Sequence, residues 1–270
     1  MAVPESKASP GFKALNALAI ALACLAYTFF FQIYPNFINP NESSRLLLAS
    51  ALVDDHTSQI DQAMRRYGDT QDKSIYAGHF YAAKVPGYSF LAAPFYFILT
   101  RIATVHDTSI MIWLLRFFVN LIPLLFFAIF FRRYLDEKIG IGAKSYFVIA
   151  AFLFGTLYYP YAQLLMSHAT TGIIWMLGFY FLTEYKEPKY GFVGGAFLGA
   201  GFVMEALSFI PIAICGLYLL IRKRRMLILY GVGAGLFSLP SFLYNAYYFG
   251  GPLNWPYEHT YDPQFQVETS

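Results

Sequence analysis

Long apolar runs separated by short polar turns set the pattern of this chain. The runs cover residues 13–34, 109–131, 144–162, 168–184, 190–205, 207–221 and 226–248. A helix that crosses a bilayer needs about 20 predominantly apolar residues, and shorter runs can tilt or pack inside a bundle. The pattern predicts an all-α polytopic membrane protein with about seven transmembrane helices, in which residues 1–270 form a single module.

One polar stretch, residues 36–108, interrupts this pattern between the first and second runs. It contains 7 of the 16 acidic residues and 3 of the 5 histidines. Ionisable groups in or beside a membrane are costly and are functional candidates by default. We therefore expect the functional site in this first extracytoplasmic loop, on amphipathic or juxtamembrane helices.

The short run 88–103 contains Pro94. Whether it crosses the membrane decides on which side of the membrane each later turn lies. Three later turns, which follow residues 131, 183 and 221, carry 4, 2 and 4 Lys or Arg residues. If 88–103 crossed the membrane, all 10 would lie outside, against the enrichment of Lys and Arg in cytoplasmic loops. We therefore predict that 88–103 is re-entrant or interfacial, that the N-terminus is cytoplasmic, and that residues 249–270 form an outer tail.

Composition narrows the class of protein further. The chain is 57% hydrophobic and 13% charged, whereas a soluble domain carries about 25% charged residues. The net charge of +3 is too small to indicate a nucleic-acid partner. Cys24 and Cys215 lie in apolar runs and are interpreted as small buried hydrophobes, and the glycines of 190–205 and 226–248 indicate close helix packing.

The first apolar run allows two interpretations. It could be a cleaved signal peptide or a retained membrane anchor. It ends in Thr-Phe-Phe-Phe-Gln rather than in small residues of the Ala-x-Ala type, which favours the anchor.

The polar loop begins with a sequence typical of a helix start. Asn39 is a good N-cap, Pro40 suits the first helical position, and Glu42 follows. The apolar residues from Leu46 onward predict an amphipathic helix on the membrane surface. Glu42 is then either a capping-box glutamate or a general base, with Arg45 one turn away.

Several other residues of this loop and of the apolar runs are candidates for a site. Asp69 and Asp72 are turn carboxylates or cavity groups, and Lys84 either snorkels to headgroups or binds a lipid phosphate. The remaining candidates are Asp54, Asp55 and His79 in the loop, Arg116 inside the second run, His168 at the start of the fourth and Glu205 at the end of the fifth. For Arg116 and His168 an interfacial structural role is equally open. Glu205 has no charged neighbour in the sequence and is expected to face a cavity.

Two motifs of this loop resemble those of the GT-C superfamily of membrane glycosyltransferases. The first is Asn41-Glu42-Ser43-Ser44-Arg45 after the first span. The second is Gly78-His79-Phe80-Tyr81, followed by Lys84-Val85-Pro86-Gly87-Tyr88. The chain is most similar to bacterial relatives of protein O-mannosyltransferases and of the lipid A aminoarabinose transferase. Many relatives have Asp-Glu where this chain has Asn41-Glu42, and full-length members continue beyond seven spans, so this chain is expected to be a fragment or a minimal module.

The resemblance implies an inverting glycosyltransferase of a bacterial inner membrane. Such enzymes move a sugar from a polyprenyl-phosphate carrier to an acceptor on the extracytoplasmic face. The general base of the family corresponds to Glu42 and its donor-phosphate lysine to Lys84. We also expect Arg45, His79 and Arg116 at the donor phosphate.

Two other classes of protein remain open at this stage. A transporter or lipid-handling protein without catalysis would distribute charges at mid-membrane depth, and a structural subunit would use its aromatic residues only for packing. Asp54-Asp55 is not an Asp-x-Asp motif, which argues against a nucleotide-sugar donor. The sequence identifies neither the sugar nor the acceptor, and it leaves a divalent metal open.

Overall fold

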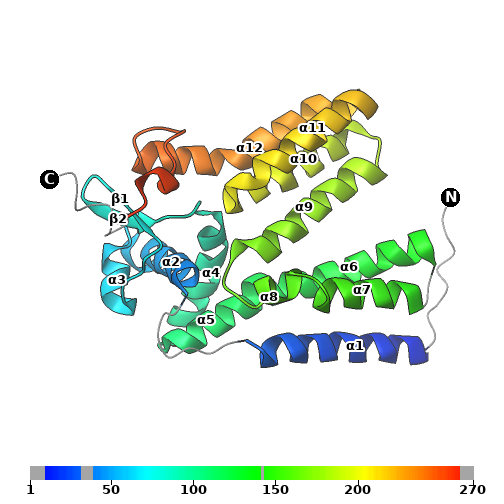
Figure 1. The fold of residues 1–270 in the computed structure, drawn as a ribbon, viewed down its shortest axis with the longest axis horizontal. Coiled ribbons are helices and arrows are strands. Elements are labelled where there is room, and N and C mark those ends of the chain that lie inside the picture. Colours follow the sequence, from blue (N-terminus) through cyan, green and yellow to red (C-terminus); the bar gives the residue numbers. More distant parts are fainter. Residues whose placement is uncertain (1–9, 32–38, 141–142, 262–270) are drawn as a thin grey trace.

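The computed structural model describes residues 10–31, 39–140 and 143–261, and it is mostly helical. Figure 1 shows long helices lying side by side, with the shorter elements of the polar loop gathered at one end. The long helices are α1 (Pro10–Phe29), α5 (Thr108–Arg116), α6 (Ile122–Ile139), α7 (Ala143–Phe154), α9 (Ser167–Glu184), α10 (Pro188–Met204), α11 (Phe209–Arg222) and α12 (Arg224–Tyr248). The predicted all-α class is therefore confirmed.

The apolar runs become helices, but most of these helices are short. Among the described residues, two helical stretches, Thr108–Ile139 and Arg224–Tyr248, are long and apolar enough to cross a membrane. Three further apolar helices are shorter: Leu18–Phe29, Lys144–Phe154 and Ala206–Arg222. The run 144–162 is broken into α7 and α8 (Tyr158–Ala162). Helix lengths alone therefore do not support seven transmembrane helices.

The longest helical stretch contains an irregularity near its middle. A π-helical turn, η2 (Phe117–Leu121), joins α5 to α6. Such turns rotate the side chains on either side relative to each other and occur often at functional sites. Here the turn follows Arg116 and contains Asn120, and both side chains are buried.

Glycines of α10 allow this helix to pack closely against α12, as predicted. A Cβ atom added to Gly191, Gly195 or Gly199 would collide with the backbone of Met226, Tyr230 or Ala234, respectively. These three glycines lie four residues apart, so they form one face of α10. The absence of side chains on this face lets the two backbones approach each other. Cys24 and Cys215 are free thiols, and Cys215 is buried.

The polar loop folds into a compact unit around a buried helix. α2 (Pro40–Ser50) is followed by the π-helical turn η1 (Ala51–Asp55), α3 (Asp61–Tyr67) and α4 (Gly87–Arg101). Asn39 caps α2 by accepting a hydrogen bond from the backbone N–H of Asn41, and Pro40 occupies the first turn, as predicted. However, every residue from Glu42 to Ser50 is buried. The prediction of an amphipathic helix on the membrane surface was wrong, because protein groups rather than water surround the polar side of α2.

The loop also contains a hairpin that the helical prediction missed. β1 (Lys73–Tyr76) pairs antiparallel with β2 (His79–Ala82), and the chain turns through Ala77 and Gly78, which both have positive φ. The segment after α12 returns to this hairpin. Its turn η4 (Pro256–His259) accepts a 2.6 Å hydrogen bond from the Ser74 hydroxyl at Pro256 O, and Thr260 bridges to Ser74. The end of the described chain thus covers the polar loop.

The glycine contact predicts a large difference between two Gly→Ala variants. Gly195→Ala places a methyl group against the Tyr230 carbonyl, whereas nothing lies within 4 Å of a Cβ at Gly235 on α12. We expect Gly195→Ala to lower the free energy of unfolding by about 1–3 kcal/mol, the usual cost of overpacking. Gly235→Ala should leave it unchanged or raise it. Thermal unfolding of both variants in the same detergent measures the difference, and equal midpoints would contradict this packing.

Candidate functional site

A buried ion pair anchors the polar loop to the helices. Glu42, on the first turn of α2, accepts hydrogen bonds at 2.8 Å from Nε and from Nη2 of Arg116 on α5. The backbone N–H of Leu165, just before α9, donates a third bond to the same carboxylate. The side chains of Glu42 and Arg116 are 3% and 1% exposed. The carboxylate predicted as general base is therefore enclosed by protein donors.

Arg45 lies one turn further along α2 and has unused hydrogen-bonding capacity. Its Nη2 donates to the Ser167 hydroxyl at 3.0 Å, and its guanidinium lies 5.5 Å from the centre of the Tyr88 ring. Its Nε and Nη1 are buried and have no hydrogen-bond partner within the described part of the chain, and the residue is 5% exposed. A buried cation with unpaired donors is costly unless an anion completes its shell. Arg45 therefore identifies a place where an anion would be stabilised.

A carboxylate lies next to Arg45 through a shared hydroxyl. Ser167 accepts from Arg45 and donates to Oε2 of Glu205 at 2.9 Å. Nδ1 of His168 lies 3.4 Å from the same oxygen. The side chains of Glu205 and His168 are 17% and 48% exposed. Unlike Glu42, Glu205 can therefore be reached from outside, as its predicted cavity-facing role requires.

The segment that leads into α4 brings Lys84 to the same region. Its Nζ lies 3.1 Å from Oδ1 of Asp72 and 5.5 Å from the Tyr257 ring centre, and its side chain is 30% exposed. Gly87 allows a close approach of the backbone of Val203 on α10. This contact places the start of α4 beside the end of α10, where Glu205 lies.

Tyr257 connects these groups from the segment after α12. Although the residue is 38% exposed, burial of its hydroxyl end raises the pKa of Tyr257 to about 12. The negative charge of Glu205 raises this pKa further, and that of Asp72 adds a smaller increase. A backbone hydrogen bond with Val85 and the positive charge of Arg45 lower it. The phenol therefore lies within electrostatic range of all three charged groups. We call Arg45, Lys84, Ser167, His168, Glu205 and Tyr257 the Arg45–Glu205 cluster.

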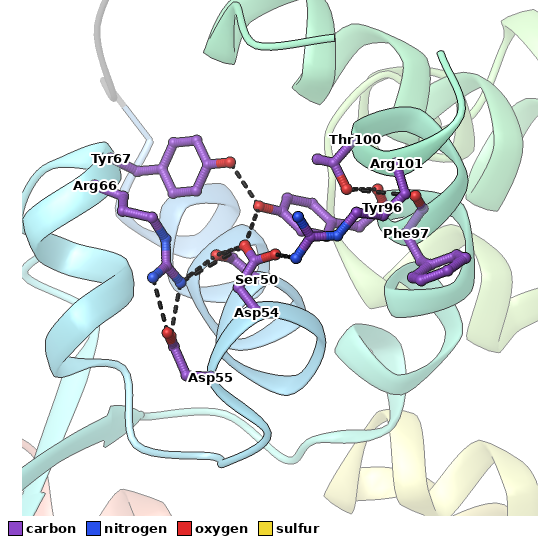
Figure 2. Close-up of polar contacts among 9 residues, drawn as sticks. All are labelled: Ser50, Asp54, Asp55, Arg66, Tyr67, Tyr96, Phe97, Thr100 and Arg101. Carbon is purple, nitrogen blue, oxygen red and sulfur yellow. Dashed lines mark hydrogen bonds and ion pairs between the residues drawn. The ribbon is translucent and has the colours of Figure 1, made fainter. Parts of the chain in front are cut away.

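Asp54 and Asp55 belong to a separate network, which holds α3 and α4 to the end of α2 (Figure 2). Arg66 on α3 binds both oxygens of Asp55, at 2.8 and 2.6 Å. Asp54 accepts from Tyr96 at 2.7 Å and from Arg101 at 2.8 Å, both on α4. Because every oxygen of these carboxylates has a cationic or hydroxyl partner, the network explains them as structural groups.

Two other predicted residues lie outside the cluster. Nδ1 of His79, at the start of β2, is 3.7 Å from Asp61, and its side chain is 49% exposed. Asp69 is 70% exposed and pairs with Lys73. Their described contacts fit a solvated hairpin, and no described contact links either residue to Arg45 or Glu205.

Several polar residues of the site escaped the sequence analysis. Asn120 accepts hydrogen bonds from Tyr88 at 2.7 Å and from Thr170 at 2.9 Å, and it donates to the Leu164 carbonyl. It thereby joins α4, η2 and the start of α9. Asn120 lies four residues after the predicted Arg116 in the same apolar run, a spacing that could have indicated it. Ser167 and Tyr257 carry no comparable sequence pattern.

The cluster can bind an anion and move a proton, and its described groups offer no metal centre. Within the described ranges, no group of three or more His, Cys, Asp or Glu side chains is arranged to hold a metal ion. Comparisons with protein-family models, curated proteins and solved structures find no match to this chain.

Arg116 is buried and Arg101 is exposed, so we expect their removal to lower the free energy of unfolding by different amounts. Arg116→Leu leaves the Glu42 carboxylate buried without its cation, and we expect a loss of about 3–5 kcal/mol in the free energy of unfolding. Arg101→Leu removes a partner of Asp54 whose side chain is 54% exposed, and it should cost about 1 kcal/mol or less. Thermal unfolding in detergent compares the two variants. Equal destabilisation would show that the Glu42–Arg116 pair does not anchor the loop.

Proposed function

We propose that this chain is the membrane module of an inverting glycosyltransferase of the GT-C type. It would transfer a sugar from a polyprenyl-phosphate carrier to an acceptor on the extracytoplasmic face of a bacterial inner membrane. The observation that carries the proposal is Arg45, a buried guanidinium with two nitrogens that lack a hydrogen-bond partner among the described residues. Arg45 is joined through Ser167 to the carboxylate of Glu205, whose side chain is 17% exposed.

The reaction needs a cation where the phosphate leaves and a base where the acceptor attacks. As the acceptor hydroxyl attacks the anomeric carbon, the bond from that carbon to the phosphate oxygen breaks. The electron pair departs with the lipid phosphate, and the hydroxyl proton passes to the base. Guanidinium N–H groups stabilise the charge that develops on the phosphate. Arg45 suits this role because two of its nitrogens have no hydrogen-bond partner among the described residues, and Lys84 supplies a second positive charge beside Tyr257.

Two carboxylates are candidates for the base, and the geometry favours Glu205. The resemblance implies Glu42, but both of its oxygens accept from Arg116 and the residue is 2% exposed. A general base must lie within hydrogen-bonding reach of the acceptor proton. Glu205 is partly exposed, and its partners Ser167 and His168 leave room for exchange. His168 can accept the proton from Glu205 or release it to solvent.

The arrangement of the helices supports a seven-crossing topology, although five of the crossings are short. α1, the α5–α6 stretch, α7, α9, α10, α11 and α12 alternate in direction along the long axis (Figure 1). The turns α6–α7, α9–α10 and α11–α12 lie at one end, and the polar loop and η4 lie at the other. The 10 basic residues thus lie at the end away from the Arg45–Glu205 cluster. α4 lies with the other elements of the polar loop at the cluster end, which supports a re-entrant or interfacial position (Figure 1).

A non-catalytic lipid-handling protein would also bind an anionic headgroup at Arg45. It would not need a carboxylate with an accessible proton path beside the anion. The two classes therefore differ in the expected role of Glu205, and substitution of this residue separates them.

Matched amide variants test the catalytic role. In membranes that contain the protein and its natural acceptors, we measure release of polyprenyl phosphate from a radiolabelled polyprenyl-phosphate-linked sugar. Glu205→Gln should lower this release by about a hundredfold, the usual contribution of a general base. Glu42→Gln removes the anion that pairs with the buried Arg116, so it should lower the free energy of unfolding, but release per mole of folded protein should fall much less than in Glu205→Gln. Binding of polyprenyl phosphate should persist in both variants.

The opposite ranking of these two variants would place the base at Glu42, as the resemblance implies. No sugar transfer by the unaltered protein, together with intact binding of polyprenyl phosphate, would favour the lipid-handling class. Arg45→Gln should weaken polyprenyl phosphate binding by about 1–3 kcal/mol, the scale of a lost charged hydrogen bond. Unchanged binding in this variant would remove Arg45 from the site.

The topology can be tested by cysteine labelling. In a Cys24→Ala, Cys215→Ala background, a cysteine at Arg225 should react with a membrane-impermeant maleimide only after the cells are permeabilised. A cysteine at Glu258, in η4, should react in intact spheroplasts, because the cluster end faces outward. Labelling of Arg225→Cys from outside would contradict the topology, because it would place the 10 basic residues on the outer side.

A further inference from the structure

A second candidate site lies between α1, α6 and α7, separate from the Arg45–Glu205 cluster. A crevice of about 210 Å³ opens there. Its apolar walls consist of Ala19, Ile20 and Ala23 from α1, Leu125, Ala128 and Ile129 from α6, and Ile149 and Leu153 from α7. Its other lining residues are Tyr146, Arg132 and Arg133. The crevice is therefore apolar along its length and basic at one end.

The spacing of the lining residues along α6 explains why the crevice is apolar along its length and basic at one end. The α6 residues of the lining, from Leu125 to Arg133, occupy one face of the helix at intervals of three and four residues. With a rise of about 1.5 Å per residue, they extend about 12 Å from the apolar end to the basic end. The small side chains of Ala19, Ala23 and Ala128 keep the three helices from filling the space between them. Ile20 is 38% exposed, so the crevice has an accessible side along α1.

The two arginines at the basic end differ in their partners. Nε and Nη2 of Arg132 donate to Asp136 at 3.3 and 3.1 Å, and Nη1 donates to the Tyr146 hydroxyl. Arg133 is exposed. Among the residues that the structure describes, it has no ion-pair or hydrogen-bond partner. The Arg132 guanidinium is thus fixed as part of the crevice wall, and the Arg133 guanidinium is a positive charge without an ion-pair partner among the described residues, at the mouth of the crevice.

We propose that this crevice binds an anionic phospholipid of the cytoplasmic leaflet. One acyl chain lies between α1, α6 and α7, and Arg133 binds the headgroup phosphate. Charge complementarity selects this occupant, because a basic mouth on an apolar crevice matches an anionic headgroup on a hydrocarbon chain. In the proposed topology, Arg133 lies at the cytoplasmic end, where the membrane surface is negative.

This inference uses the proposed membrane orientation but not the transferase reaction. Its test contains no sugar donor, so failure of lipid binding and failure of sugar transfer are distinguishable. The full chain is purified in detergent, stripped of lipid and titrated with dioleoyl phosphatidylglycerol or dioleoyl phosphatidylcholine, and bound lipid is counted by native mass spectrometry.

The unaltered protein should retain phosphatidylglycerol in preference to phosphatidylcholine. Arg133→Gln should reduce phosphatidylglycerol retention by about fivefold, which corresponds to about 1 kcal/mol for one basic residue near an anionic lipid. It should leave phosphatidylcholine retention unchanged. Ala128→Phe fills the crevice and should reduce retention of both lipids. Arg225→Gln is the control, because this exposed arginine of the same end does not line the crevice.

Equal retention of the two lipids by the unaltered protein would overturn the proposal. So would equal effects of Arg133→Gln and Arg225→Gln. Thermal unfolding checks that the variants are folded. If Ala128→Phe does not fold, the comparison of the two exposed arginines decides the question alone.

Discussion

The Glu42–Arg116 ion pair is the interaction on which the rest of this structure depends. It connects the first turn of α2 to the end of α5, and the Leu165 N–H adds the start of α9 to the same carboxylate. A buried ion pair offsets its desolvation cost only when hydrogen bonds satisfy its remaining atoms. Three donors converge on Glu42, so the pair fixes the depth and rotation of α2. That position in turn places Arg45 against Ser167.

Charge separates the two ends of the molecule. The basic turns gather at one end of the long helices, whereas the carboxylates of the polar loop and Glu205 lie at the other (Figure 1). Within the acidic end, the structure divides the carboxylates again. Asp54 and Asp55 are saturated by arginine and tyrosine donors and hold the loop together (Figure 2). Glu205 has a similar exposure, 17% against 16% for Asp54 and for Asp55, but its described partners are Ser167 and His168 rather than arginines.

The helix α10 shows how packing supports that position. Its glycine face lies against α12, and its last turn meets Gly87 at the start of α4. Two close backbone contacts thus hold the end of α10, and Glu205 follows directly as its C-cap residue. The carboxylate is therefore placed by rigid elements although it lies at the end of a helix.

Apolar periodicity and local capping determined much of this fold at the level of sequence. Most runs predicted a helix within a few residues, although the second continues to Ile139 and the run 144–162 breaks into α7 and α8. Asn39-Pro40 predicted the start of α2 and the glycines of α10 predicted close packing, because each depends on neighbouring residues alone. The sequence also indicated Arg45, Lys84, Arg116, His168 and Glu205 as polar residues in costly places. Their grouping depended on tertiary structure. Contacts between Glu42 and Leu165, or Arg45 and Ser167, join residues more than 100 positions apart, and no local pattern encodes such distances. For the same reason, the burial of α2 and the return of Tyr257 to the loop appeared only in the folded chain.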